Sequence, residues 1–195
     1  MADSAASKTT PANKVLMGLL IASVIGLVIW QYQIINGKAS PRGGTAAEGL
    51  TFKLANGGTV SLPDEDSEKY TLLVFWDADS ERSLEEVAEA AKLAESAELD
   101  SIIQFYFVNL NEGLQEVQQA VNTVDLAGMV GYDPSGSFMD QFQIRVVPYA
   151  VLLSNTGKTL DMVEGYEEGQ LKLRSRRWVS SYRTTGPSGE FKFGF

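Results

Sequence analysis

One stretch, Tyr70 to Val87 (YTLLVFWDADSERSLEEV), constrains the fold of this chain more than any other. It begins with an apolar run that ends at Trp76, and a short polar, turn-forming segment follows. After the turn, the apolar residues Leu84, Val87 and Ala91 recur at the spacing of one face of a helix. The stretch therefore predicts a buried strand, a short turn and an amphipathic helix.

Further patterns predict the other elements of one α/β domain. Residues 51–62 (TFKLANGGTVSL) alternate apolar and polar positions around Asn56-Gly57-Gly58, which is typical of a β-hairpin. The later predicted elements are a strand over 102–110, a helix over 113–124, a short helix around 138–144, strands over 150–153 and 159–163, and a last helix over 168–182.

The strand–turn–helix stretch resembles the thioredoxin-like superfamily, and within it the membrane-anchored TlpA/ResA-like group. In that group the strand ends in a motif similar to FWATWCxxC, and its two cysteines sit at the start of the helix. Phe75 and Trp76 match the strand end, whereas Ser80 and Ser83 fall at the two cysteine positions.

Two other segments carry the same resemblance, which covers about residues 50 to 182. Val147 and Pro148 match the valine and the cis-proline that face the active-site turn in thioredoxin-like proteins. The hairpin over 51–62 is similar to one that TlpA-like domains carry ahead of the core. The resemblance implies a thioredoxin-like fold with an N-terminal β-hairpin.

The absence of cysteine and histidine bears directly on the chemistry. Thiol–disulfide exchange needs a thiolate and a second sulfur, and a serine hydroxyl supplies neither. A serine nucleophile would need an adjacent base, and Asp77 or Asp79 at a helix N-terminus would be stabilised as a weakly basic anion. No acidic calcium-loop motif is present. We expect a chain that is not an enzyme and has no cofactor and no metal site.

The resemblance also implies a surface that binds a protein segment at the former active site. Its predicted members are Trp76, Asp77, Asp79, Ser80, Glu81, Arg82, Ser83, Val147 and Pro148. A structural interpretation of the serines stands beside this one. Ser80 or Ser83 can cap the helix by accepting from backbone amides, and Glu86 is spaced to complete a capping box with Ser83.

The N-terminal region contains a candidate membrane anchor. No charged residue occurs from Val15 to Gly37, and this is long enough to cross a bilayer. A cleaved signal peptide is the alternative, although its apolar region would be shorter and Gly37-Lys38-Ala39 is a poor cleavage site. Within the span, small residues four apart either pack against another helix or reflect ordinary membrane-helix composition. These residues are Gly18, Ala22 and Gly26.

The predicted organisation has five parts. They are a disordered segment over 1–14, a transmembrane anchor over 15–36, a flexible linker over 37–49, a thioredoxin-like domain over 50–183 and a tail over 184–195. The basic residues flanking the span are nearly balanced, so they do not set its orientation. The resemblance implies a single-pass protein of the inner membrane, with its N-terminus in the cytoplasm and its domain in the periplasm.

Charge is unevenly distributed along the chain. The net charge of −9 argues against nucleic acid as a partner. An acidic set on the predicted helix is either a solvated face or a docking site for a basic partner; it comprises Glu85, Glu86, Glu89, Glu95 and Glu98. A basic set near the C-terminus either contacts lipid headgroups or a partner, or suits the dipole of an ordinary C-terminal helix. It comprises Lys172, Arg174, Arg176, Arg177 and Trp178.

These observations favour a redox-inactive, membrane-anchored domain that binds proteins as a scaffold or assembly subunit of a membrane complex. The alternative is an accessory role in thiol–disulfide exchange or cytochrome c maturation, beside a partner that carries the missing cysteines.

Overall fold

The computed structural model describes residues 47, 49–110, 112–124, 126, 129–165 and 167–189. The predicted anchor over 15–36, with Gly18, Ala22 and Gly26, lies outside these residues, as do the segment 1–14, most of the predicted linker and residues 190–195 of the predicted tail. No helix within the described ranges combines the length and the apolar character needed to cross a bilayer.

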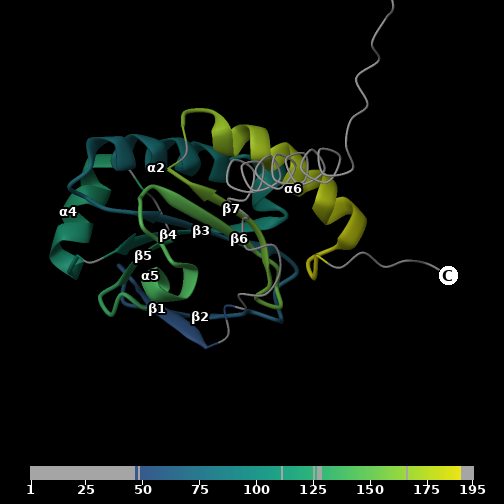
Figure 1. Cartoon of the computed structure of the whole chain (residues 1–195), viewed down its shortest axis with the longest axis horizontal. Coiled ribbons are helices and arrows are strands. Elements are labelled where there is room, and N and C mark those ends of the chain that lie inside the picture. Colours follow the sequence, from purple (N-terminus) through teal and green to yellow (C-terminus); the bar gives the residue numbers. More distant parts are fainter. Residues whose placement is uncertain are drawn as a thin grey trace, which may run out of the picture. The chain divides into compact units, whose positions relative to one another are not determined.

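The described residues form one α/β domain (Figure 1). Its strands are β1 (Leu50–Leu54), β2 (Thr59–Leu62), β3 (Tyr70–Trp76), β4 (Ile103–Leu110), β5 (Val130–Asp133), β6 (Tyr149–Leu153) and β7 (Thr159–Glu164). Its helices are α2 (Glu81–Ala94), α3 (Ala97–Asp100), α4 (Leu114–Val124), α5 (Ser137–Phe142) and α6 (Gln170–Thr185).

The strands form a seven-stranded sheet in the order β2-β1-β5-β4-β3-β6-β7. The central strands β3, β4 and β5 run parallel, because helices return the chain from the end of one strand to the start of the next. The predicted hairpin forms and joins the sheet through an antiparallel pairing of β1 with β5. On the other side, β6 pairs antiparallel with β3, and β7 pairs antiparallel with β6.

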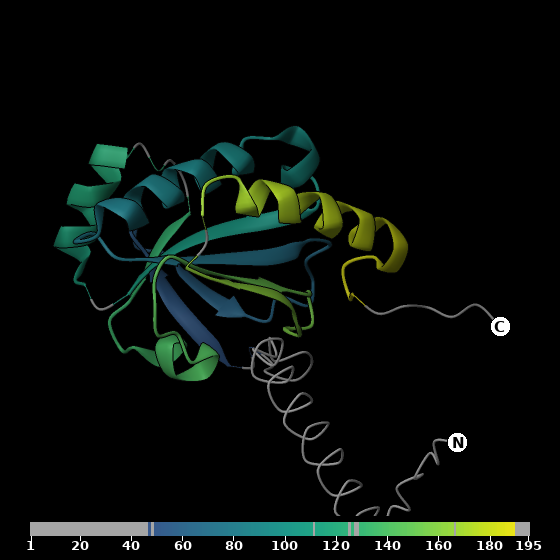
Figure 2. The same ribbon diagram turned by 45° about the horizontal axis from the view of Figure 1, so that its top comes forward.

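Alternate residues of β3 supply the two hydrophobic cores of the domain. Leu72 and Val74 pack in the core that includes residues of α2, α4 and α6, whereas Leu73 and Phe75 pack with the hairpin and α5. Figures 1 and 2 show α2 and α6 side by side over one face of the sheet and α5 on the opposite face. Both faces of β3 are covered, which explains why its whole apolar run is buried.

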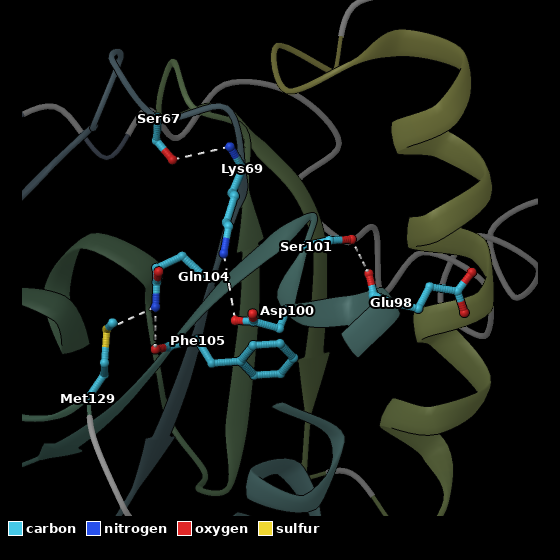
Figure 3. A network of polar contacts seen from close by, with 8 residues as sticks. All are labelled: Ser67, Lys69, Glu98, Asp100, Ser101, Gln104, Phe105 and Met129. Atoms are coloured by element: carbon cyan, nitrogen blue, oxygen red, sulfur yellow. Dashed lines mark hydrogen bonds and ion pairs between the residues drawn. The ribbon is translucent and has the colours of Figure 1, made fainter. Parts of the chain in front are cut away.

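Polar contacts hold the end of the sheet where β3 and β4 begin (Figure 3). Lys69, just before β3, lies 3.6 Å from the carboxylate of Asp100. The hydroxyl of Ser101 donates to the carbonyl of Glu98 over 2.8 Å. Nearby, Gln104 donates to the sulfur of Met129 over 2.8 Å. These contacts join turns to strand ends, and they lie at the end of the sheet opposite the turn that follows Trp76.

The last helix extends three residues beyond its predicted end, to Thr185. Thr185 is buried, and its hydroxyl lies 3.1 Å from that of Tyr70 at the start of β3. Because this contact joins residues far apart in the sequence, the local pattern gave no sign of it. The predicted short helix ends at Phe142, since Gln143 takes a left-handed conformation with φ 52°.

Candidate functional site

The predicted binding surface lies where β3 ends. Asp77 to Ser80 form the turn between β3 and α2. Phe75 of β3 pairs with Tyr149 at the start of antiparallel β6, so the preceding loop with Pro148 lies at the same end of the sheet. The Val147–Pro148 peptide bond is cis, as the resemblance implied. Carboxyl ends of parallel strands are the usual position of sites in open α/β sheets.

Three side chains build the entrance to α2. Ser80 is the N-cap residue, and its Oγ accepts from the backbone N–H of Ser83 over 3.1 Å. Oδ1 of Asp77 accepts from the N–H of Ser80 over 2.9 Å. Oγ of Ser83 accepts from the N–H of Asp77 over 3.2 Å. The capping interpretation is therefore confirmed for Ser80, and both serine oxygens satisfy backbone donors of the turn.

The capping box of Ser83 with Glu86 is wrong. Ser83 lies inside the first turn of α2 and is fully buried, so it is not the cap. Its hydroxyl faces back toward Asp77. Glu86 is itself buried on α2.

Three members of the predicted surface are not accessible to a partner. Trp76 and Ser83 are both 0% exposed, because the strand end and the first helical turn are covered on both sides of the sheet. Pro148 is also buried, and its carbonyl accepts from the N–H of Gly165 over 2.9 Å. The exposed members are Asp79, Glu81 and Arg82, with Asp77, Ser80 and Val147 partly exposed.

Sequence reasoning missed Val146, whose exposed fraction is 51%. Few large apolar side chains of the described residues are so exposed, and Val146 lies just before the cis Val147–Pro148 bond, at the same end of the sheet as the turn after β3. No sequence signal indicated this exposure, because Ile144 and Val146 are both apolar, and only the structure shows that the first is buried and the second is not. Arg145 beside it is exposed as well.

Sequence reasoning also missed Glu112, two residues after β4. Both of its carboxylate oxygens accept from the N–H of Ala78, over 3.0 and 3.1 Å. Nδ2 of the fully buried Asn109 donates to the same carboxylate. Glu112 therefore holds the turn after β3 from the neighbouring strand. No local pattern indicates a contact between residues 34 positions apart.

The basic set near the C-terminus is divided by the structure. Trp178 is 4% exposed, and its Nε1 donates to Oδ2 of Asp161 on β7 over 2.9 Å. Arg174 donates to Oδ1 of the same carboxylate over 2.6 Å. The predicted headgroup or partner contact is therefore wrong for Trp178, which is buried and holds α6 on the sheet, whereas Arg174 pairs with Asp161 and stays partly exposed. Lys172, Arg176 and Arg177 are exposed, and for them it stays a prediction.

The acidic set is divided too, so the interpretation as a solvated face is wrong in part. Glu86 is only 8% exposed. Glu89 accepts from the N–H of Gly169 with both carboxylate oxygens, over 2.9 and 3.0 Å. Glu98 pairs with Arg183 over 2.8 Å. Glu85 and Glu95 are exposed, as expected.

This arrangement limits what the site can do chemically. The serine oxygens accept hydrogen bonds from the turn backbone, and neither lies beside an imidazole, because the chain has no histidine. Among the residues described, no three carboxylates come together in a way that could hold a metal ion. What the site offers is a surface, with Asp79 and Glu81 on the turn side and Val146 on the loop side.

No protein-family model matches the chain, and no curated protein sequence matches it. Among solved structures, a thiol-disulfide oxidoreductase from Bacteroides fragilis is 20% identical, with a TM-score of 0.59 over 68% of this chain and 98% of that one. The pneumococcal exposed lipoprotein thioredoxin Etrx1 from Streptococcus pneumoniae is 18% identical, with a TM-score of 0.57 over 66% of this chain and 98% of that one.

A protein from Chlorobium tepidum, assigned as the thiol:disulfide interchange protein DsbE, is similar to the same extent. It is 18% identical, with a TM-score of 0.61 over 69% of this chain and 94% of that one. Identities this low establish the architecture alone. The domain therefore has the thioredoxin-like fold found in thiol-disulfide oxidoreductases, and serines occupy its helix entrance.

Proposed function

We propose that this chain is a redox-inactive, membrane-anchored thioredoxin-like domain that binds a protein partner as a scaffold or assembly subunit. The observation that carries the proposal is the hydrogen bonding of the two serines. In a fold shared with thiol-disulfide oxidoreductases, Ser80 and Ser83 both accept from backbone amides at the entrance of α2. They hold the turn in shape and supply no sulfur.

The chemical argument follows from what exchange requires. A disulfide is reduced when a thiolate attacks one sulfur and a second thiol resolves the mixed disulfide. The chain contains no cysteine to perform either step. The fold and the outline of the site are kept, but the sulfur atoms are missing. Binding of a partner is therefore the function that we assign to this surface.

The surface itself suits a protein partner. Val146 presents an apolar side chain that is half exposed, beside partly buried Val147 and the turn carrying Asp79. An apolar side chain surrounded by polar groups matches the centre-and-rim arrangement of protein interfaces, in which the partner buries the apolar centre. The hydrogen bonds from the N–H of Ala78 to Glu112 hold the turn after β3 in one conformation, so binding of a partner would cost little conformational entropy there.

Photo-crosslinking in the protein's own membranes tests the proposal. A photoreactive amino acid is placed at Val146 in the full chain, and a matched one at Lys158, which is exposed in the turn at the opposite end of β6. We expect a discrete crosslinked protein from position 146 and none from position 158. Equal capture at both positions, or none at either, would contradict the binding role. We expect the purified chain not to reduce insulin. Measurable reduction of insulin would contradict redox inactivity.

The structural neighbours favour a second candidate function, because several are thiol-disulfide oxidoreductases. In this alternative, the chain presents or shields a client for a cysteine-bearing partner in thiol–disulfide exchange or cytochrome c maturation. Identification of the crosslinked protein separates the two candidates. A partner with a paired-cysteine motif, together with altered thiol oxidation or cytochrome c content when the chain is deleted, supports the second.

The proposed location is the inner membrane, with the domain on the periplasmic side. Protease added to intact spheroplasts is the direct test, since it should remove the domain from the outside. Protection of the domain until the membrane is lysed would reverse the orientation.

A further inference from the structure

The last helix, α6, differs in charge from the rest of the chain. The net charge of the chain is −9, yet no acidic residue lies between Gln170 and Gly189. The basic residues of α6 are Lys172, Arg174, Arg176, Arg177 and Arg183. Figures 1 and 2 show α6 on the outside of the domain, beside α2.

The structure divides these basic residues by their partners. Arg174 and Arg183 form ion pairs with carboxylates of the domain. Lys172, Arg176 and Arg177 are exposed, and no ion pair or hydrogen bond joins their side chains to another described residue. Three neighbouring cations of an acidic chain are therefore available to an anion outside the domain.

Leu173 lies among these cations. Its exposed fraction is 60%, the largest among the exposed large apolar side chains in the described part of the chain. Arg176 and Arg177 follow it by three and four positions, so the three side chains share one face of the helix. We call Lys172, Leu173, Arg176 and Arg177 the α6 strip. At a membrane interface, an apolar side chain enters the acyl boundary while basic residues meet anionic lipid.

The chain enters the domain near the end of α6. The N–H of Ala47 donates to the carbonyl of Gly157 over 2.9 Å. In the same turn, the N–H of Asn155 donates to the carbonyl of Pro187, just after α6, over 3.0 Å. The predicted linker from residue 37 to Ala47 has about 10 residues, which as a flexible chain span about 17 Å on average. Arg177 lies about 12 Å along the helix from its C-terminal end. A membrane anchor ahead of the linker would therefore keep the strip within reach of the bilayer.

Anionic phospholipid is the occupant that this arrangement fits best. The three cations have no fixed hydrogen-bond geometry, and a lipid surface supplies phosphates at any spacing. Each basic residue near such a surface strengthens binding about fivefold, the factor that corresponds to about 1 kcal/mol. The rest of the chain is strongly acidic and is repelled by the same surface, so α6 is the side that can face it. Glu167 and Glu168, exposed just before α6, limit the contact to the helix itself.

We propose that the α6 strip docks the domain on an anionic bilayer, with Leu173 inserted between headgroups and its three cations on lipid phosphates. Docking by α6 turns the opposite face of the sheet, which α5 covers, away from the membrane. The linker argument rests on the proposed membrane anchor. The affinity of the strip for anionic lipid does not, and it is measured separately.

A spin label tests the docking directly, because the chain has no cysteine and one introduced cysteine is the single labelling site. Leu173→Cys places the label in the strip, and Asp140→Cys places it at an exposed position of α5. The full chain is reconstituted in vesicles of phosphatidylcholine alone and in vesicles with about 30% phosphatidylglycerol. We expect the anionic vesicles to protect the label at position 173 from a water-soluble paramagnetic relaxant by at least about threefold. The label at position 140 should stay equally accessible in both.

Charge variants in the Leu173→Cys chain show whether the cations of the strip cause the protection. Arg176→Gln with Arg177→Gln should weaken docking about 25-fold, which is about fivefold for each cation removed. Lys53→Gln with Arg145→Gln removes the same charge from exposed positions outside α6 and should leave the protection unchanged. Salt at about 1 M should remove most of the protection, because it screens the attraction to lipid phosphates.

Several results would overturn the proposal. They are no protection at position 173 in the anionic vesicles, equal protection in phosphatidylcholine alone, equal protection at position 140, and equal losses in the two double variants. Protection that requires native membranes with their other proteins would overturn it too, because the strip would then bind a protein partner.

Flotation of the chain with each kind of vesicle separates this failure from a failure of the proposed anchor. A chain that floats with phosphatidylcholine vesicles and shows no protection at position 173 in anionic ones keeps the anchor and refutes docking. A chain that floats with the anionic vesicles alone supports docking and contradicts the anchor.

Discussion

The serines at the entrance of α2 should behave as structural residues, and their removal should cost stability in a predictable way. Ser80→Ala deletes the acceptor of the Ser83 N–H, the single cap bond of α2 made by a side chain. Loss of such a cap costs about 1 kcal/mol, within a range of about 0.5–2 kcal/mol. Ser80→Asp keeps an acceptor at the cap and should remain close to the wild-type free energy of unfolding.

Ser83→Ala should cost more than a surface change at the same helix. Ser83 is fully buried, and its Oγ satisfies the N–H of Asp77. Leaving that donor without a partner costs about 1–3 kcal/mol. The cap bond uses the N–H of Ser83 and the second bond uses its Oγ, so the two share no atom. Because the two residues are nevertheless hydrogen-bonded to each other at one turn, the loss in the double variant should differ from the sum of the single losses by about 0.5–3 kcal/mol.

Urea unfolding of the full chain in detergent measures these losses through tryptophan fluorescence, since Trp76 and Trp178 are both buried. Each kcal/mol should also lower the melting temperature by about 2–4 °C. Ser180→Ala, on the exposed side of α6, is the matched control and should stay within about 0.5 kcal/mol of wild type. If Ser80→Ala and Ser83→Ala match this control, the structural role assigned to the two serines is refuted.

Three further predictions follow from the same contacts. Ser80→Cys with Ser83→Cys should form a reversible intrachain disulfide, detected by thiol titration after mild oxidation; thiols that both stay reduced would show that the turn cannot support the bond. Asp161→Ala should cost about 2–3 kcal/mol in urea unfolding, because it leaves the indole N–H of buried Trp178 without an acceptor; an unchanged midpoint would contradict this. Burial raises the pKa of Glu86 in the folded state. Its contribution to the free energy of unfolding is therefore fully present below the carboxyl pKa of the unfolded chain, and it is lost as the pH rises through the folded-state pKa. The Glu86→Gln variant should accordingly be more stable than wild type at pH 8 and should lose that advantage near pH 4. If the variant is less stable than wild type at pH 8, Glu86 is not an unpaired buried carboxylate.

Local sequence patterns predicted most of the secondary structure. The run from Tyr70 to Trp76 became a strand, and the helical spacing after Ser80 became α2. The turn residues Asn56-Gly57-Gly58 predicted the hairpin. These signals work because residues two to four positions apart determine which face of a strand or helix is apolar. The limits of the last helix were less accurate, because its final turn is stabilised by a distant contact with Tyr70.

Several residues predicted for the binding surface are buried in the structure. Trp76 and Ser83 were assigned to a surface from their place in a motif, yet the packing of helices on the sheet buries both. Trp178 was assigned to a membrane or partner contact from its basic neighbours, whereas Asp161 holds it on β7. A motif gives the order of residues along the chain, and exposure depends on which elements pack against them.

The sequence by itself determined the kind of domain and the absence of cysteine from it. Periodicity and turn residues are local properties, and the absence of cysteine is a property of composition. Only the tertiary structure decided which polar groups act together. Glu112 clamps Ala78, Glu89 holds Gly169, and Glu86 is left buried without a partner for Oε2. The physical reason is that these contacts join side chains brought together by the sheet and the helices packed on it, and no local repeat along the chain records them.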